Sequence, residues 1–384
     1  MSGAALLDAD SSAALLPPGV HREPRAPQRK RPQSFHDAFD ASSMGYDCFW
    51  HADGKRVLLV GPPPVNLVAD YALASFTAQP SRTSVRMRLH TSLSVMIIEL
   101  RDVPEGSTSI AVTFGKQTVE LPIRANQSGR LEGARILFGM NRNNDLAWIS
   151  EWASFHRRLH GTDTVILYDN GSTAYGRGDL VETLRAISGL AHVAVPSWPQ
   201  PFGRTDPAVR LNPYWAHFPQ IASMSAVLRR YGARAAGILN ADIDELVQAP
   251  GGRSIYEVAS SLRHGLAVFR GRWVEAVPLT GAAADHRDYG LVQRDPKRAR
   301  SRPNKWALDP KRAWVANLDV HPYWHWIAGR PMFAKVAPEG ALYWHFRGIN
   351  TNWKHDRTSP ATGREGLEPD AELADAFARA RPAS

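Results

Sequence analysis

The chain has 384 residues, of which 43% are hydrophobic and 22% are charged, and its formal net charge is +9. This composition is typical of a soluble protein with room for one large domain or two modest ones, and no apolar run approaches the length of a membrane-spanning helix. The single cysteine, Cys48, excludes an internal disulfide and a metal cluster built on cysteine.

The first residues lack the charged start and the long apolar core of a secretory signal. Together with the lone cysteine, this predicts a cytoplasmic protein. The positive net charge could favour nucleic acid, anionic lipid or phosphorylated substrates. Because the basic residues are dispersed apart from two clusters, small phosphorylated substrates are the first expectation and nucleic acid is not expected.

Residues 1–45 are rich in proline, arginine and lysine and show little apolar periodicity. Such a composition predicts a disordered leader, which could make a weak contact with an anionic membrane surface. Residues 46–130 instead contain short apolar runs at 56–60, 94–100 and 109–114, separated by turns. This pattern predicts a small β-rich, sandwich-like domain that could bind carbohydrate or pack on the next domain.

Strands and helices alternate through residues 131–360, which predicts an α/β domain with a mainly parallel sheet flanked by helices. The expected strands are 135–140, 164–168, 192–195 and 235–239, and the expected helices are 145–159, 180–187 and 213–231. Residues 361–384 are expected to form a tail or a helix.

Polar residues follow several of these strands, at Asn141, at Asp169 with Asn170, and at Asp242. In sheets of this kind, ligands bind beyond the carboxyl ends of the strands. A carboxylate or amide in that place can accept hydrogen bonds from a ribose or a base. We therefore expect Asn141, Asp169 and Asn170 to contact a bound nucleotide.

The tetrapeptide Asp242-Ile243-Asp244-Glu245 follows a buried apolar strand. Alternation along an extended chain points Asp242 and Asp244 to the same side, where two hard oxygen ligands suit Mg²⁺ or Mn²⁺. Such an ion keeps positions for waters and substrate phosphates. The sequence therefore predicts a divalent metal holding a diphosphate, and the alternative is a solvated acidic turn.

Several stretches resemble glycosyltransferases of the GT-A fold, and most closely glycosyltransferase family 92 and its bacterial relatives. The resemblance covers about residues 131–357. The matching stretches are Arg142-Asn143-Asn144-Asp145-Leu146-Ala147-Trp148-Ile149-Ser150-Glu151-Trp152, Val165-Ile166-Leu167-Tyr168-Asp169-Asn170-Gly171-Ser172-Thr173, Asp242-Ile243-Asp244-Glu245-Leu246, Asn304-Lys305-Trp306 and Trp344-His345-Phe346, the last followed by Lys354.

The resemblance implies a GT-A-like mixed sheet, a UDP-sugar donor and transfer with inversion. It implies that Arg142 and Asn143 border the base and that Asp169 binds the uridine. It also implies that Asp242 and Asp244 hold the metal and the diphosphate, and that His345 approaches them from the C-terminal side. Two residues depart from the family pattern, because Asn144 stands where an acid is usual and Phe346 where tyrosine is usual.

A basic stretch at 294–312 could clamp a leaving diphosphate, or its side chains could be solvated. Lys305 is the expected donor contact in it, because that residue matches the family. His321 and His325 have the spacing of metal ligands on a helix, but Pro322 and the aromatic neighbours favour a structural role or a place in the lining of an acceptor site.

The implied inversion needs a carboxylate that takes a proton from the acceptor hydroxyl. Glu275 is the expected base, with Asp285 and Asp288 as rivals. The sequence thus predicts a metal-dependent glycosyltransferase that moves a sugar from a nucleotide-sugar donor to a carbohydrate or another hydroxyl acceptor. The alternatives are a degenerate protein that only binds sugar or nucleotide, and a basic protein that binds nucleic acid or membranes.

Overall fold

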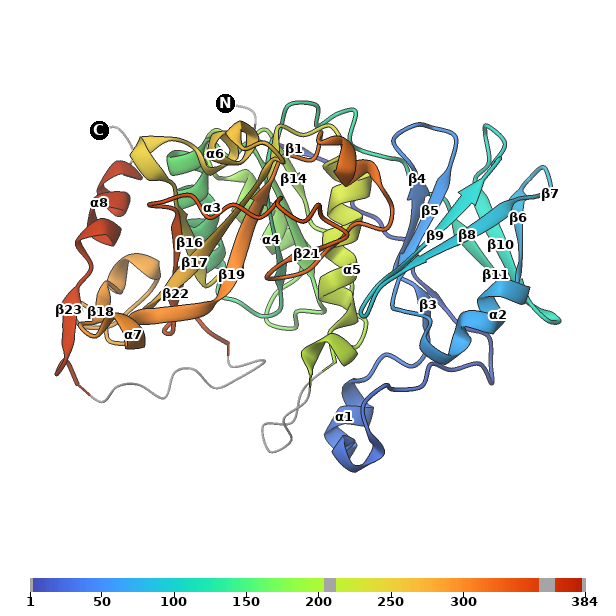
Figure 1. The fold of residues 1–384 in the computed structure, drawn as a ribbon, viewed down its shortest axis with the longest axis horizontal. Coiled ribbons are helices and arrows are strands. Elements are labelled where there is room, and N and C mark those ends of the chain that lie inside the picture. Colours follow the sequence, from blue (N-terminus) through green and yellow to red (C-terminus); the bar gives the residue numbers. More distant parts are fainter. Residues whose placement is uncertain (1–2, 204–211, 352–362, 382–384) are drawn as a thin grey trace.

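A nine-stranded mixed sheet forms the centre of the computed structural model (Figure 1), which describes residues 3–203, 212–351 and 363–381. The strands of this sheet, in spatial order, are β1 (Ala5–Leu6), β14 (His192–Ala194), β13 (Thr164–Asp169), β12 (Arg135–Asn141), β15 (Gly237–Asn240), β19 (Arg300–Leu308), β17 (Leu266–Val274), β22 (Leu342–Phe346) and β16 (Glu245–Gln248). The predicted α/β class is confirmed at this level: a large mixed sheet is flanked by helices and accompanied by smaller β-rich sheets.

The sheet changes character at β15. From β1 to β15 all neighbouring strands are parallel, whereas β19 runs antiparallel to both β15 and β17. In the parallel part β1 comes first at the edge; β12 follows, β13 and β14 are added on one side of it, and the chain then returns to place β15 on the other side of β12. The boundary between β12 and β15 is therefore a topological switch point, and open α/β sheets bind ligands beyond the strand ends at such a point.

Helices cover the two faces of this sheet and enclose two hydrophobic clusters. One face packs against α3 (Leu146–His160), α4 (Arg177–Arg185), α6 (Ile255–Ser261) and α8 (Ala371–Arg379). The other face packs against α5 (Phe218–Ala226), which continues as a wider helical turn (Val227–Tyr231), and against the hairpin of β20 (His321–Pro322) and β21 (Ile327–Ala328).

Local sequence signals explain the ends of α3. Asp145 caps the helix by accepting a 2.8 Å hydrogen bond from the backbone N–H of Ala147. Gly161 ends it in the left-handed conformation, with φ of +67°, which glycine adopts without steric cost. The predicted helix at 145–159 is thus confirmed to within one residue at each end.

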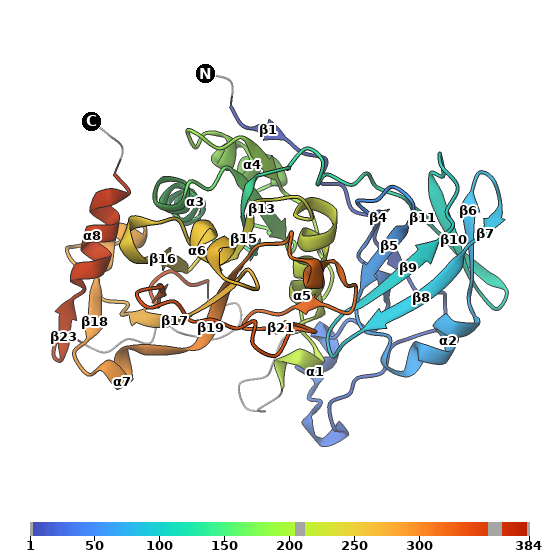
Figure 2. The same cartoon turned by 45° about the horizontal axis from the view of Figure 1, so that its top comes forward.

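Two four-stranded antiparallel sheets make up the β-rich region. One contains β4 (Asp47–Trp50), β5 (Val57–Gly61), β9 (Met96–Arg101) and β8 (Arg86–Thr91), and the other contains β11 (Gln117–Pro122), β10 (Ser109–Phe114), β6 (Ser75–Gln79) and β7 (Thr83–Ser84). Figure 2 shows both beside the large sheet, with α2 (Val68–Leu73) along their edge.

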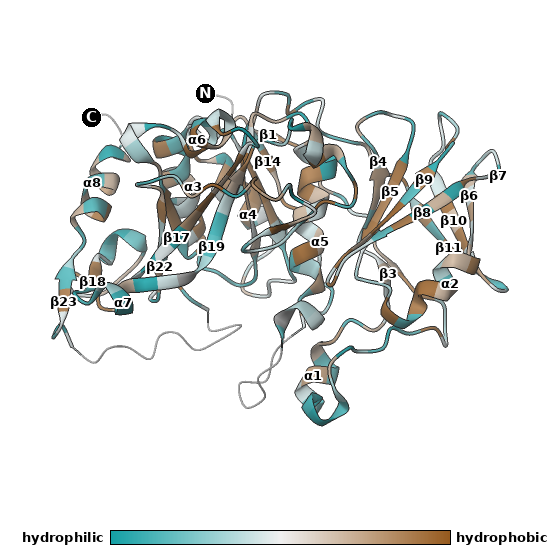
Figure 3. Cartoon of the chain, viewed as in Figure 1, coloured by the Kyte–Doolittle hydropathy of each residue, from teal (hydrophilic) through white to brown (hydrophobic). Residues whose placement is uncertain are grey.

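The β-rich region shares part of its core with the large sheet. Phe49, Leu58, Val60 and Ile97 belong to the same hydrophobic cluster as α5 and the strands β12 and β15. Figure 3 shows hydrophobic residues along β4 and β5 where they face α5. A third hydrophobic cluster, separate from the two that flank the large sheet, fills the space between the two smaller sheets. The region therefore packs directly on the α/β part.

The N-terminal segment differs from the predicted disordered leader, because residues 3–45 pack against both parts of the chain. They contain β1, β2 (Ala14–Leu15), β3 (Ser43–Gly45) and α1 (Gln33–Ala38), and β1 extends the large sheet beside β14. Leu7, Phe35 and Phe39 are buried. The guanidinium of Arg22 is buried as well and donates to the backbone oxygens of Pro63, Asp40 and Ser43 at 2.6, 3.0 and 2.8 Å. These carbonyls satisfy a charge that composition alone predicts to be solvated.

The remaining elements are short. β18 (Leu291–Gln293) pairs with β23 (Leu367–Pro369) next to α7 (Pro296–Ala299), and single 3-10 turns cover Gln28–Lys30, Val65–Leu67, Pro213–Trp215, Pro250–Gly252, His286–Asp288 and Ala313–Ala316. In the part of the chain that the structure describes, none of the helices has the length and apolar character needed to cross a membrane.

Candidate metal and nucleotide site

The tetrapeptide Asp242-Ile243-Asp244-Glu245, called the acidic turn below, carries the chain across the end of the sheet. β15 ends at Asn240 and β16 begins at Glu245, yet β19, β17 and β22 lie between these two strands. Residues 241–244 therefore pass the ends of three strands, which brings their carboxylates against side chains of β19 and β22. This crossing explains why residues more than 60 positions apart in the sequence meet here, as Asp242 and Lys305 do.

Backbone hydrogen bonds hold the turn in place. The N–H of Glu245 donates to the carbonyl of Asp242 at 3.0 Å, and the N–H of Asp242 donates to Oε2 of Glu245 at 2.8 Å. The N–H of Phe346 donates to the carbonyl of Asp244 at 2.9 Å. His286 Nε2 lies 2.8 Å from the carbonyl oxygen of Ile243. A turn fixed on both sides in this way is more ordered than a solvated acidic loop.

Lys305 of β19 supplies a buried positive charge to the turn. Its Nζ lies 2.7 Å from Oδ2 of Asp242 and 2.8 Å from Oε2 of Glu245, and its side chain is 1% exposed. Burial by itself would lower the pKa of Lys305, but the two carboxylates outweigh burial and raise the pKa above its ordinary value. Burial raises the pKa of Glu245, and the ammonium group of Lys305 opposes this rise.

Asp244, Glu245 and His345 form a group that could hold a metal ion, since one ligand atom of each lies within 4.8 Å of the others. Nε2 of His345 is 3.0 Å from Oδ2 of Asp244, and His345 stands opposite Glu245 in the pairing of β22 with β16. Two carboxylates and one imidazole make an oxygen-rich donor set that suits a small divalent cation.

The orientation of His345 is fixed by its neighbours. Nδ1 lies 3.2 Å from Oγ of Ser301, and the ring stacks on Trp273 with a centroid distance of 4.0 Å. The guanidinium of Arg347 covers the indole of Trp273 at 4.2 Å. A hydrogen bond to the second ring nitrogen is the usual way in which proteins orient a metal-binding histidine.

A second group of polar side chains joins the ends of β12 and β13. Asn141 and Asp169 are the last residues of these strands and stand opposite each other. Nδ2 of Asn141 donates to Oδ1 of Asp169 at 2.9 Å, and Asp169 also accepts from the N–H and Oγ of Ser172. Asn143 accepts from the N–H groups of Thr173 and Ala174 at 2.7 and 3.0 Å.

These bonds give the polar group a structural function in addition to any contact with a ligand. They tie the loop after β12 to the loop after β13, next to the switch point between β12 and β15. Asn170 extends the network, because its Nδ2 donates to the carbonyls of Trp198 and Gln200 at 2.6 and 2.9 Å. Its Oδ1 is buried without a hydrogen-bond partner among the residues that the structure describes. Arg142 is half-buried in the loop that follows β12.

The predicted base, Glu275, is buried directly after β17. Oε2 lies 3.3 Å from Nε of Arg347, and Oε1 accepts from Nε2 of Gln293 at 3.3 Å. Neighbouring side chains therefore contact both oxygens of this carboxylate. The two alternative candidates for the base accept hydrogen bonds from the neighbouring backbone. Asp285 accepts from the N–H of Arg287 at 2.8 Å, and Asp288 accepts from the N–H groups of Ala284 and Asp285.

The two histidines near Pro322 do not lie on a helix. His321 is buried in β20, whereas His325 lies in the loop that leads to β21. Nδ1 of His325 is 2.8 Å from the carbonyl oxygen of Asn304, next to Lys305 on β19. Burial lowers the pKa of His325 to about 4, and the charge of Lys305 adds to this effect.

The structure brings together most of the predicted metal residues and adds others. Asp244 and His345 lie together, and Asp242 lies in the same turn as Asp244 and contacts Lys305 of β19. Glu245, Ser301 and Trp273 were not assigned a function from the sequence. Glu245 could have been found, since it belongs to the acidic tetrapeptide, whereas Ser301 and Trp273 carry no sequence signal. Lys354 lies outside the described residues.

No model of a known protein family and no curated protein matches the chain. The chemistry of the site therefore has to be inferred from its residues and their geometry.

Proposed function

We propose that the protein is a metal-dependent glycosyltransferase that moves a sugar from a nucleotide-diphosphate donor, a UDP-sugar, to a hydroxyl acceptor with inversion. The observation that carries this proposal is the Asp244, Glu245 and His345 group, which the acidic turn after β15 brings together with β22. The resemblance of five stretches to GT-A glycosyltransferases supports the same conclusion.

The proposal assigns a function to the residues around the acidic turn and to those after β12 and β13. Asp244, Glu245 and His345 hold Mn²⁺ or Mg²⁺, with Asp242 next to them in the turn. The cation supplies positive charge that stabilises the leaving diphosphate. Lys305 contacts Asp242 and Glu245 at 2.7 and 2.8 Å and offsets part of the cost of burying the Glu245 carboxylate. Asn141, Arg142, Asn143, Asp169 and Asn170 border the nucleotide.

Calorimetry of UDP binding with Mn²⁺ and with EDTA tests this function. We expect UDP to bind at least ten times more tightly with Mn²⁺, and we expect Asp244→Asn to remove that gain because it removes a charged ligand. Asp375→Asn, which changes an exposed carboxylate on α8, is the matched control and should behave like the wild type. Equal UDP affinity with and without metal would refute the proposal.

A second candidate function is binding of a nucleotide-sugar without transfer. The contacts of Glu275 favour it, because Arg347 and Gln293 occupy the two oxygens of the carboxylate that the sequence assigns as the base. Release of free UDP from UDP-sugars in the presence of Mn²⁺ and a hydroxyl acceptor separates the two functions. A protein that binds a UDP-sugar but never releases UDP would be the binding protein.

A further inference from the structure

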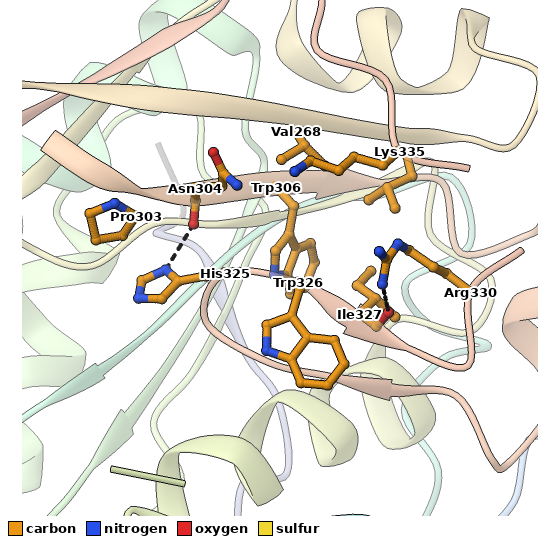
Figure 4. Close-up of a pocket in the computed structure, with 10 residues that line it drawn as sticks. Val268, Pro303, Asn304, Trp306, His325, Trp326, Ile327, Arg330 and Lys335 are labelled. Atoms are coloured by element: carbon orange, nitrogen blue, oxygen red, sulfur yellow. Dashed lines mark hydrogen bonds between the residues drawn. The ribbon is translucent and has the colours of Figure 1, made fainter. Parts of the chain in front are cut away.

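A pocket of about 340 Å³ lies against β19 (Figure 4). Its walls come from β17, β19, the hairpin of β20 and β21, and the loop that follows. The lining residues are Leu266, Val268, Pro303, Asn304, Trp306, His325, Trp326, Ile327, Arg330 and Lys335. Small-molecule sites in proteins span about 300 to 1,000 Å³, so this volume fits one small ligand.

The pocket adjoins the candidate metal site. β15 ends at Asn240, opposite Trp306, so the earlier residues of β19 run past the end of β15. Lys305 turns toward the acidic turn, whereas Asn304 and Trp306 line the pocket, as alternation along a strand requires. His325 connects the two, because it lines the pocket and is close enough for the charge of Lys305 to lower its pKa.

The lining is positively charged. It includes Arg330 and Lys335, and none of its described residues is acidic. Arg330 is held in place by a 2.8 Å hydrogen bond from Nη1 to the carbonyl of Ile327, which leaves other N–H groups of the guanidinium for a ligand. Two cations without a compensating carboxylate in the wall favour an anionic ligand, since charge-assisted hydrogen bonds to carboxylate or phosphate are the strong ones.

The opposite wall is aromatic and rigid. One face of Trp326 stacks on Tyr323, with a centroid distance of 4.5 Å and an angle of 12° between the rings. Nε1 of Trp326 donates to the hydroxyl of Tyr214 at 3.3 Å. Figure 4 shows the indole on one side of the pocket and Asn304 and Lys335 on the other. A fixed aromatic surface facing polar groups can hold the apolar face of a sugar ring while its hydroxyls reach hydrogen-bond partners.

We propose that this pocket binds a sugar that carries a carboxylate or a phosphate group. Trp326 contacts the ring, Arg330 and Lys335 hold the anion, and Asn304 and His325 contact hydroxyls. That this sugar is the acceptor of the transfer rests on the proposed function and on the position of His325, which lines the pocket and contacts Asn304 next to Lys305. The binding itself does not depend on it.

Three probes of equal ring size test the pocket: methyl glucoside, methyl glucuronide and glucose 6-phosphate, each titrated into the full chain by calorimetry or saturation-transfer NMR. We expect the glucuronide or the phosphate to bind at least ten times more tightly than the neutral glucoside. Comparison of the two charged probes identifies the preferred anion. Equal binding of all three, or no binding, would overturn the proposal.

Variants of the lining residues show whether the charged sugar binds in this pocket. The double variant Arg330→Gln, Lys335→Gln should lose the preference for the charged sugar, and Trp326→Ala should weaken all three probes. Lys55→Gln with Lys116→Gln removes the same charge from exposed positions of the β-rich region and should change nothing. A preference that survives in the pocket variant would show that the anion binds elsewhere.

Binding of UDP with Mn²⁺, measured on the same samples, separates this proposal from the proposed function. If the protein prefers the charged sugar but fails to bind UDP, the proposal of an anionic sugar site stands and the proposed transferase function is refuted. If the protein binds UDP with Mn²⁺ but shows no preference among the sugars, the proposed function stands and the proposal of an anionic sugar site is refuted.

Discussion

Charge balance at the acidic turn depends on single residues. Three carboxylates lie within four positions, and Lys305 contacts two of them while His345 contacts the third. A buried ammonium this close both stabilises the carboxylates and repels an incoming dication. The affinity of the site for metal is therefore set by a competition between Lys305 and the cation.

Replacement of this lysine should change metal binding and stability in opposite directions. We expect Lys305→Gln to bind Mn²⁺ about tenfold more tightly, because a positive charge is removed beside the ligands. Without metal the variant should unfold more easily, since Glu245 would stay buried without its ion partner. Calorimetry with Mn²⁺ and thermal unfolding with EDTA measure the two effects.

Lys311→Gln is the control, because it removes an exposed lysine from the same basic stretch. It should leave both quantities unchanged. If Lys305→Gln binds Mn²⁺ with the affinity of the wild type, the lysine does not compete with the cation.

The residues of this site were predictable only in part. Asp244 and His345 were assigned to the metal, and they do lie together. The sequence cannot show that the chain crosses three strand ends between β15 and β16, and this crossing decides which carboxylate meets which partner. For that reason the contact of Lys305 with two carboxylates was not expected.

Among the elements, α3 is held by two buried histidines that are neutral. Nδ1 of His156 lies 2.8 Å from the carbonyl oxygen of Trp152, and its Nε2 accepts from the N–H of Val247 at 3.3 Å. Nε2 of His160 lies 2.8 Å from the carbonyl oxygen of Val247, and its Nδ1 accepts from the N–H of Ile255 at 3.2 Å. Each ring donates once and accepts once, which only the neutral form can do. The helix is thereby joined to β16 and α6.

These histidines should make the fold sensitive to acid. Burial lowers the pKa of His156 to about 3 and that of His160 to about 4, whereas both stay near 6.5 in the unfolded chain. Above pH 6.5 both states are neutral and the contribution to stability is complete. As the pH falls toward 4, the unfolded state takes up protons first, so the free energy of unfolding falls, by up to about 1.4 kcal/mol per pH unit for each histidine.

Urea unfolding at pH 7.5, 6 and 5 measures this dependence. His156→Gln should be less stable at pH 7.5 and should lose less stability on acidification, because one of the two linked groups is gone. His36→Gln changes an exposed histidine of α1 and should keep the slope of the wild type. Parallel slopes for His156→Gln and the wild type would exclude this linkage.

Periodicity predicted the helices and strands between residues 135 and 240, but it predicted neither the strands of the large sheet that follow nor the tertiary partners. Residues 145–159 show a clear apolar stripe and a glycine stop, so α3 was predicted closely. The spacing of His321 and His325 was ambiguous, because Pro322 and the aromatic residues around it form a hairpin through contacts with Trp306 and Tyr214. Contacts between distant residues decide such a case, and the local pattern does not contain them.

At the scale of the whole molecule, the N-terminal segment joins the β-rich region to the α/β part. Arg230, at the end of the turn after α5, donates to Oδ2 of Asp47 in β4 at 2.9 Å and to the carbonyl of Asp10 at 2.8 Å. β1 extends the large sheet, and β2 pairs with β3. Low apolar content predicts disorder only for a chain that must order itself alone. Here two folded parts supply the buried surface and the hydrogen-bond partners.

Loss of Arg22 should therefore destabilise the whole protein although the residue lies in a segment rich in proline and charge. Its guanidinium satisfies three carbonyls, those of Pro63, Asp40 and Ser43, which lie in two different parts of the chain. In Arg22→Met these acceptors stay buried without donors, at a cost of about 2–4 kcal/mol in the free energy of unfolding. Arg25→Met is the matched control, because Arg25 is exposed and makes one such bond, to Leu93, so its cost should stay below about 1 kcal/mol. Urea unfolding of both variants measures the difference. Equal stabilities would mean that the three hydrogen bonds of Arg22 contribute no more to the fold than the single bond of Arg25.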